Sequence, residues 1–216
     1  MTSRELVIRG EPVLLLAQKA LYWPRQKMLV IADIHFGKAA AFRAQGVPVP
    51  RGTTTENLEA LDALTQLHET EQIVFLGDFL HARASHASAT VAAILAWRQR
   101  HPALRLLLVR GNHDARAGDP SGTLGIEIVD EPFTLGTFSF CHHPDVAGEG
   151  YVLAGHVHPV YLLSSRLDSL RLPCFLVGPQ RMVLPSFGAF TGGHVITPGA
   201  DEQVFVSSGE AVHYVR

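Results

Sequence analysis

Residues suited to metal chemistry gather in five short segments of the sequence. These segments are Asp33-Ile34-His35, Gly77-Asp78, Gly111-Asn112-His113-Asp114, Cys141-His142-His143 and Gly155-His156-Val157-His158. Carboxylate, imidazole and amide groups without a cluster of thiolates suit divalent manganese, iron or zinc, and not a structural zinc site of the cysteine type. Seven candidate ligands are too many for one ion, so two ions that share an aspartate fit better. Two ions about 3.5–4 Å apart are the arrangement that phosphatases and nucleases use.

The elements that must position these segments alternate between strands and helices. Apolar runs predict strands at residues 28–32, 73–76 and 104–109, and helical spacing predicts helices at 55–69 and 87–100. This β-α-β-α-β series favours a parallel sheet with crossover helices. From residue 126 onward the pattern changes to short strands between glycine and proline turns, which predicts a second, partly antiparallel sheet. Its strands are expected at residues 138–141, 151–154, 173–177, 182–184 and 204–207.

Each polar segment directly follows one of the expected strands. Ligands of open α/β sheets gather beyond the carboxyl ends of the strands, so the five segments are expected to converge on one crevice. Asp33 and His35 are two residues apart, as are His156 and His158. Period-two spacing at a strand end would place both members of such a pair on one face. Glycines directly before three of the segments' polar side chains would permit the sharp turns that aim them.

Composition narrows the class of protein. The chain has 216 residues, of which 47% are hydrophobic and 18% charged, and a single domain spanning residues 1–216 is the simplest expectation. Its formal net charge of −2 lacks the excess of positive charge that is typical of tight, non-specific nucleic-acid binding. A nuclease that holds phosphate through metal ions is still compatible with this charge. The two cysteines, Cys141 and Cys174, are expected in the core and fit the reducing cytoplasm. No export signal, membrane span or lipidation signal is visible.

Four motifs follow one another between Asp33 and His158: Asp-x-His, Gly-Asp, Gly-Asn-His-Asp and Gly-His-x-His. This order resembles the calcineurin-like metallophosphoesterase superfamily. Further stretches are similar to one branch, the bacterial ligase-associated DNA damage response endonucleases, so the resemblance runs nearly end to end. These stretches are Asp33-Ile34-His35-Phe36-Gly37-Lys38, Gly46-Val47-Pro48-Val49-Pro50 and Leu184-Pro185-Ser186-Phe187-Gly188-Ala189-Phe190-Thr191-Gly192-Gly193. The resemblance implies a two-sheet β core flanked by helices, in the α/β/β/α order.

The resemblance also implies roles for the polar side chains. The first metal ion would be held by Asp33, His35 and His158. The second would be held by Asn112, His142 and His156, with Asp78 bridging the two. His113 would face the substrate and assist the leaving group, and Asp114 beside it is a candidate for orienting it.

The sequence departs from the superfamily pattern at two positions. Three residues after the bridging aspartate the superfamily often has another aspartate, and here His81 stands there. The fourth motif usually reads His-Gly, and here it reads His142-His143-Pro144. Alignment assigns the ligand to His142, with His143 as a competitor.

The implied activity is phosphodiester hydrolysis. Hydroxide formed between two ions would attack phosphorus in line, and His113 would donate a proton to the departing oxygen. The sequence shows no nucleophile elbow, P-loop or Rossmann fingerprint, so covalent catalysis is not favoured. The first functional hypothesis is a DNA endonuclease of DNA repair that uses two divalent metal ions. Manganese is the expected metal, with iron or zinc as alternatives. The other readings are a phosphohydrolase of nucleotides or cyclic nucleotides, and a scaffold that has lost catalysis.

The expected substrate is DNA, and the family name implies a functional association with a DNA ligase and a helicase. Several side chains outside the motifs allow both a functional and a structural interpretation. Lys38, Arg43, Arg51 and Arg110 could meet substrate phosphates or lie on solvated surfaces. Phe187 and Phe190 could stack a base or simply pack. His81 could touch the rim of the site or be exposed.

Overall fold

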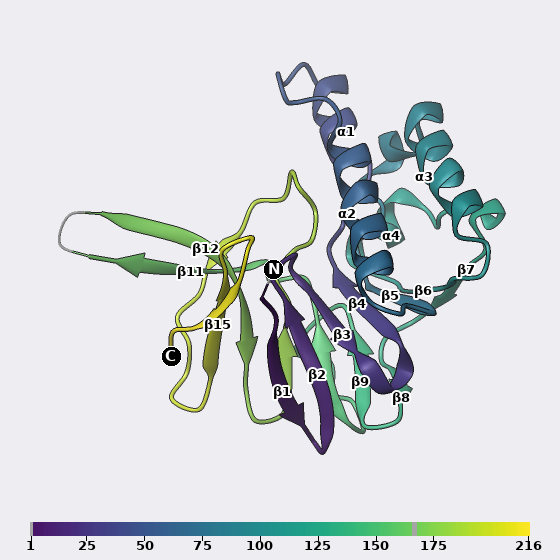
Figure 1. The fold of residues 1–216 in the computed structure, drawn as a ribbon. Coiled ribbons are helices and arrows are strands. Elements are labelled where there is room, and N and C mark those ends of the chain that lie inside the picture. Colours follow the sequence, from purple (N-terminus) through teal and green to yellow (C-terminus); the bar gives the residue numbers. More distant parts are fainter. Residues whose placement is uncertain (1, 166–167) are drawn as a thin grey trace.

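Two β-sheets stacked face to face form the core of the protein, and helices cover one of them (Figure 1). The structure is a computed structural model, and it describes residues 2–165 and 168–216. The first sheet runs in the order β1 (Arg4–Ile8), β2 (Glu11–Leu16), β3 (Ala20–Trp23), β4 (Met28–Ala32), β5 (Gln72–Leu76), β6 (Arg105–Val109) and β7 (Ile126–Val129). Strands β4 to β7 are parallel, whereas β1 to β4 pair antiparallel.

The second sheet mixes parallel and antiparallel pairs, as the sequence predicts. It runs in the order β14 (His194–Val195), β11 (Pro159–Ser164), β12 (Ser169–Val177), β13 (Arg181–Val183), β10 (Tyr151–Ala154), β9 (Phe138–Cys141) and β8 (Phe133–Leu135). β15 (Gln203–Ser207) pairs with β12, and β16 (Val212–Tyr214) pairs with β15. β9 and β10 are parallel to each other. Their carboxyl ends therefore point the same way, which matters for the site.

The helices lie on the side of the first sheet (Figure 1). They are α1 (Lys38–Ala44), α2 (Thr53–Leu67), α3 (Ser88–Arg100) and α4 (Asn112–Ala117), with short 3-10 turns η1 (Pro24–Gln26), η2 (Arg83–His86) and η3 (Gly122–Leu124). α1 and α2 connect β4 to β5, and α3 connects β5 to β6. The β-α-β-α-β series is confirmed, and α2 and α3 lie within two residues of the helices expected at 55–69 and 87–100.

The period-two pattern of β4 explains why the sheets stack. Leu29 and Ile31 pack into the core beneath the helices, whereas Met28, Val30 and Ala32 pack into the core between the sheets. Burying each such large aliphatic side chain on either face contributes roughly 1.5–3 kcal/mol. A strand that is apolar on both faces can be stable only between two layers. Short apolar stretches such as residues 28–32 therefore predict buried strands.

The expected α/β class and two-sheet core are confirmed. The structure adds the antiparallel strands β1 to β3, which precede the first expected strand. Across residues 2–165 and 168–216, the helices that pack on a sheet do so on the first one, in the core that includes Leu61, Leu64 and Trp97. Within those ranges, no helix has the length and apolar character needed to cross a membrane.

Candidate metal centre

The five polar segments meet where the carboxyl ends of β4, β5, β6, β9 and β10 come together. The backbone amide of His35 donates to the carbonyl of Asp78 over 2.9 Å, and that of Gly155 donates to the carbonyl of His142 over 3.1 Å. The amide of His156 donates to the carboxylate of Asp33, with 2.9 Å to Oδ2. These bonds join segments of both sheets, so the convergence expected from the strand ends is present.

A first cluster contains Asp33, His35, Asp78 and His158, whose candidate ligand atoms all lie within 4.8 Å of one another. Nε2 of His158 is 3.4 Å from Oδ1 of Asp33, and Nε2 of His35 is 3.5 Å from Oδ2 of Asp78. Both carboxylates and His35 are buried. These are the three residues that the family resemblance implies for the first metal ion, together with Asp78, which it implies as the bridging ligand.

A second cluster contains Asp78, Asn112, His142 and His156. Nε2 of His142 lies 2.9 Å from Oδ1 of Asn112, 3.1 Å from Nδ1 of His156 and 3.5 Å from Oδ1 of Asp78. Asp78 therefore directs Oδ2 toward the first cluster and Oδ1 toward the second. That division of one carboxylate is the geometry a bridging ligand requires.

His142 and His143 compete for one ligand position in the sequence, and the structure separates them. His142 is fully buried within the second cluster. His143 lies beside it, with its ring 4.5 Å from that of His156 and its Nδ1 2.6 Å from Oε1 of Glu131. The geometry favours His142, although one nitrogen of His143 also lies within 4.8 Å of His142 and His156.

The hydrogen bonds of these histidines indicate which nitrogen is free to bind a cation. Nδ1 of His142 lies 3.0 Å from the carbonyl of Leu76, and Nδ1 of His158 lies 3.1 Å from that of Gly192. Because a carbonyl only accepts, each Nδ1 carries a proton, and in the neutral imidazole each Nε2 then presents a lone pair to an aspartate. Nε2 of His35 is buried and has no hydrogen-bond partner. Lone pairs facing carboxylates repel one another, so this donor set fits divalent cations, and the bonds to carbonyls are those that metal-binding histidines usually make.

The backbone reaches this geometry by a route different from the one the sequence suggests. Asp33, His35, Asp78, His156 and His158 all have φ between 49° and 69°, in the left-handed region. The members of each pair therefore lie in tight turns after their strands, and not in extended backbone with period-two spacing. Such a conformation costs roughly 1–2 kcal/mol for each residue that is not glycine. Strain of this kind concentrates at functional sites, where the surrounding structure holds it in place.

The glycines next to the ligands are required mainly for close approach. Only Gly77 has the left-handed φ expected of a turn, at 73°, and a Cβ on it would stand 2.2 Å from Nδ1 of His142. A Cβ on Gly111 would lie 2.4 Å from the amide nitrogen of Asp78. A Cβ on Gly155 would lie 2.7 Å from Oδ2 of Asp33. A side chain at any of the three would displace a residue of the clusters.

His113 lies at the edge of the centre, with 31% of its side chain exposed. Its Nδ1 donates to the carbonyl of His81 over 2.7 Å, and its Nε2 lies 4.0 Å from Oδ2 of Asp78. Asp114, expected as its orienting partner, instead accepts from the amides of Leu80 and Gly111. Asp114 thus fixes the loop that carries His113, and the carbonyl of His81 orients the ring.

His81 belongs to the site and is not an exposed residue. Its ring stacks on that of His113 at 4.7 Å, and its Nδ1 lies 3.3 Å from Nδ1 of His35. Burial, and then the positive charge of Lys38, lower the pKa of His81 to about 4. Burial also lowers the pKa of Lys38, against the opposing charges of Asp78 and Asp33. Lys38 is therefore close enough to the aspartates for its charge to act on the centre.

Other basic candidates have different surroundings. The guanidinium of Arg110 donates to Asp119 and to Asp130, so its charge is already paired. Arg43 donates to the carbonyl of Pro50 over 2.7 Å. Both cysteines are free and buried, as expected, and burial raises the pKa of Cys141 to about 11.

Glu131 is a residue that sequence reasoning misses. Its Oε2 accepts from the amides of His142 and His143, at 2.7 and 2.8 Å, while its Oε1 accepts from the ring of His143. Burial opposes its ionisation, but the hydrogen bonds from these two histidines outweigh burial and lower its pKa. Nothing in the spacing marks it, because Glu131 precedes β8 and reaches His142 only through the pairing of β8 with β9.

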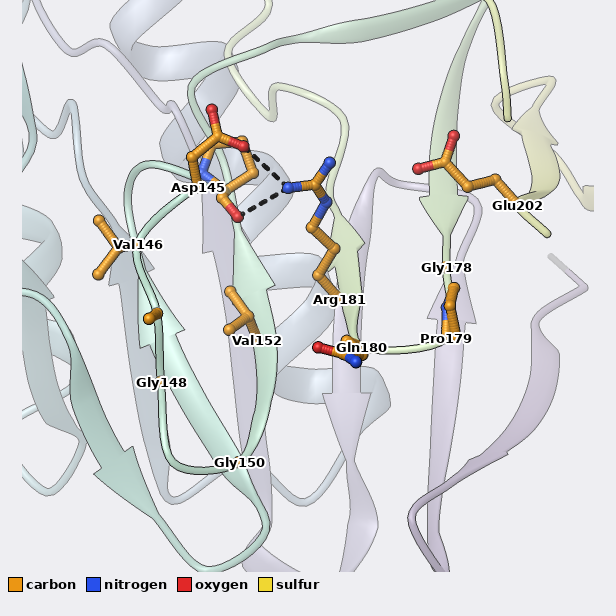
Figure 2. A pocket seen from close by; sticks show the side chains of 12 residues that line it. Asp145, Val146, Gly148, Gly150, Val152, Gly178, Pro179, Gln180, Arg181 and Glu202 are labelled. Atoms are coloured by element: carbon orange, nitrogen blue, oxygen red, sulfur yellow. Dashed lines mark hydrogen bonds and ion pairs between the residues drawn. The ribbon is translucent and has the colours of Figure 1, made fainter. Parts of the chain in front are cut away.

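One cavity of the molecule lies apart from this centre, whereas a smaller one of about 110 Å³ has His158 in its lining. The first of these cavities has a volume of about 470 Å³. Figure 2 shows its lining residues, which include Val146, Val152 and Gln180. There Arg181 donates to Oδ1 of Asp145 over 2.8 Å. None of the seven predicted ligands lines this cavity. The ligand clusters lie at the rim where strands of the two sheets end.

Comparison with known proteins identifies the class to which this site belongs. Residues 26–168 match the calcineurin-like phosphoesterases. The chain therefore belongs to the calcineurin-like phosphoesterase family, and it is a metal-dependent phosphoesterase.

One solved structure is similar to the chain over its whole length. It is the Pseudomonas putida nuclease MPE, at 44% identity and a TM-score of 0.88, covering 99% of this chain and 100% of that one. The protein of unknown function AQ665 from Aquifex aeolicus is 18% identical over 61% of this chain and 78% of its own. The phosphoesterase Yfce from E. coli is 13% identical over 87% and 97%, and both have a TM-score of 0.41. No curated protein matches the chain.

The contacts of Glu131 predict that Glu131→Ala weakens metal binding. The loss of three hydrogen bonds would free the backbone and ring at His142 and His143. Removing such an outer partner typically lowers metal affinity by about 10- to 100-fold. Titration calorimetry with Mn²⁺ measures the change. Glu149→Ala, at an exposed carboxylate in the connection between β9 and β10 that also contains His142 and His143, is the matched control. Equal affinity in the two variants would contradict this role.

Proposed function

We propose that this protein is a two-metal phosphodiesterase that cuts DNA as an endonuclease. The observation that carries the proposal is the division of Asp78, whose two oxygens are directed at separate ligand clusters. The nuclease function in the name of the 44% identical Pseudomonas putida structure supports nucleic acid as the substrate. A role in DNA repair with a ligase and a helicase stays a prediction from the family resemblance.

The proposed ligand sets are the two clusters. Asp33, His35 and His158 would hold one ion, and Asn112, His142 and His156 the other. Asp78 would belong to both. Oxygen and imidazole donors suit Mn²⁺, our first choice, and also accept iron or zinc. When bound, a pair of such cations activates water and neutralises charge on phosphate oxygens.

The remaining steps fall to side chains of the chain itself. The bond from Nδ1 of His113 to the carbonyl of His81 fixes the ring and leaves Nε2 toward the open edge of the centre. From there Nε2 can hold a proton and deliver it to the departing oxygen. Asp114 keeps the preceding loop in place through its bonds to Leu80 and Gly111. The stacked ring of His81 prevents His113 from turning away.

The activity is tested with a panel of substrates in the presence of Mn²⁺. The purified protein should hydrolyse bis(p-nitrophenyl) phosphate and single-stranded circular DNA, since the latter has no ends. Excess chelator should abolish both activities, and Mn²⁺ in excess over the chelator should restore them. Equal rates with chelator would contradict the metal mechanism. Hydrolysis only of cyclic nucleotides or a phosphomonoester would favour the small-molecule alternative.

His113→Ala should lower turnover without removing metal. Loss of a general acid typically costs about 10²- to 10⁴-fold in rate. Neither of the two proposed ligand sets includes His113, although one of its nitrogens lies within 4.8 Å of nitrogens of His35 and His81. Turnover of the chromogenic diester and metal content by elemental analysis are measured together. His213→Ala, at an exposed histidine of β16, is the control. If His113→Ala loses metal instead, the residue is a ligand and the proposed role is wrong.

Asp78→Asn should impair both ions together. The amide removes the negative charge and leaves one oxygen for two clusters, so neither ion keeps its full set of donors. Elemental analysis of dialysed protein should show metal content falling from near two ions toward none. Asp201→Asn, at an exposed position, should leave metal content unchanged. Retention of one complete ion would contradict the bridging assignment.

A further inference from the structure

Aromatic side chains lead outward from the centre along one side. The ring of His81 stacks on His113 at 4.7 Å and lies 5.8 Å from the ring of Phe42. Phe42 in turn meets Phe190 edge to face at 5.9 Å. The row therefore begins at His113, the residue proposed to face the leaving group, and ends three rings further out at Phe190. It joins four segments that are far apart in sequence.

Phe42 and Phe190 are not core residues. On α1, Ala39 and Ala41 are buried, whereas Phe42 beside them is only half-buried. In the segment 184–193, Phe187 is buried in the core beneath the helices, whereas Phe190 is half-buried. Two large rings beside a polar centre therefore keep some exposed surface through which they can contact a ligand.

The segment that carries Phe190 is held firmly in place. Ser186 donates its hydroxyl to the carbonyl of Asp33 over 2.8 Å, and Lys19 donates to the carbonyl of Phe187 over 2.8 Å. The amide of Ala189 donates to Oδ1 of Asn57, whose Nδ2 donates to the carbonyl of Ile34. Phe190 is thus tied to the turn that carries Asp33. A backbone held in this way needs little further ordering when the side chain that it carries meets a ligand.

We infer that Phe42 and Phe190, with His81 between Phe42 and the centre, form a stacking platform for a nucleobase next to the phosphodiester being cut. The inference rests on the proposed nuclease function. Every nucleobase has an aromatic face, so stacking holds a nucleic acid without reading its sequence. It also suits this chain, whose net charge of −2 provides little general attraction for a polyanion.

The test compares a single-stranded oligonucleotide with an oligomer of equal length that carries abasic sugars. Both present the same phosphates, but only the first has bases to stack. The wild-type protein should cleave the natural oligonucleotide about tenfold or more faster in kcat/KM, which is within the range for loss of one stacked base. Phe42→Ala and Phe190→Ala should remove most of that preference. Each oligonucleotide rate is divided by the rate on bis(p-nitrophenyl) phosphate, which reports on the metal centre alone.

Two kinds of control keep the test specific. Phe42→Tyr and Phe190→Tyr retain an aromatic ring and should keep the preference for the natural oligonucleotide. Retention in these variants would show that the alanine variants lose the preference because the ring is absent. Tyr214→Ala, at a 54% exposed aromatic of β16, should leave the preference unchanged.

Three results would overturn the inference. The first is that the wild-type protein cleaves natural and abasic oligomers at equal rates. The second is that the alanine variants keep the wild-type preference. The third is that the rates of the alanine variants on the diester and on the oligonucleotide fall in parallel. A wild-type protein that hydrolyses the diester but no oligonucleotide would overturn the proposed nuclease function itself.

Discussion

The carboxylate of Asp78 lies between two clusters of imidazole, carboxylate and amide donors, and both sheets are built to hold it there. The residue follows β5 of the first sheet, yet its Oδ1 lies 3.5 Å from His142, which follows β9 of the second. A second buried carboxylate, Asp33, lies in the same centre. Two buried negative charges without compensation would be strongly unfavourable. The charge of Lys38 alone does not balance them, whereas bound divalent cations would.

The need to hold donors from both sheets around Asp78 also explains the strained backbone of the centre. Bringing donors from five strand ends within a few ångströms leaves no room for side chains at Gly77, Gly111 and Gly155. It also forces ligands such as Asp33 and Asp78 into left-handed conformations. The large apolar cores above and below the first sheet stabilise this arrangement. A site of this kind therefore needs an extensive core on both faces of the sheet that carries it.

The sequence predicts the membership of the clusters better than their geometry. The strands at 28–32, 73–76 and 138–141 are recognisable because short, fully apolar runs have no other stable place. The ligand types then follow from what stands at each strand end. In contrast, the turns at Asp33 and Asp78 depend on close approach between segments, which local spacing does not encode.

Contacts across long separations are also invisible in the sequence. Glu131 reaches His142 because β8 pairs with β9, and the carbonyl of His81 orients His113 because α4 begins beside the turn after β5. The expectation that Asp114 orients His113 follows from their adjacency in sequence. Its buried carboxylate instead satisfies backbone amides, a need that only the folded loop reveals.

The charges on the protein surface bear on how the centre would attract a phosphate group. Arg25, Arg100, Arg110 and Arg181 each lie in an ion pair with an aspartate or glutamate. The formal net charge of −2 also gives the chain no overall excess of positive charge to attract phosphate from a distance. Without cations, the buried Asp33 and Asp78 would repel a phosphodiester, whereas cations bound at the same centre would attract it. Metal binding and substrate binding would then be coupled through these two carboxylates, and contacts with the uncharged parts of the substrate would supply the rest of the affinity.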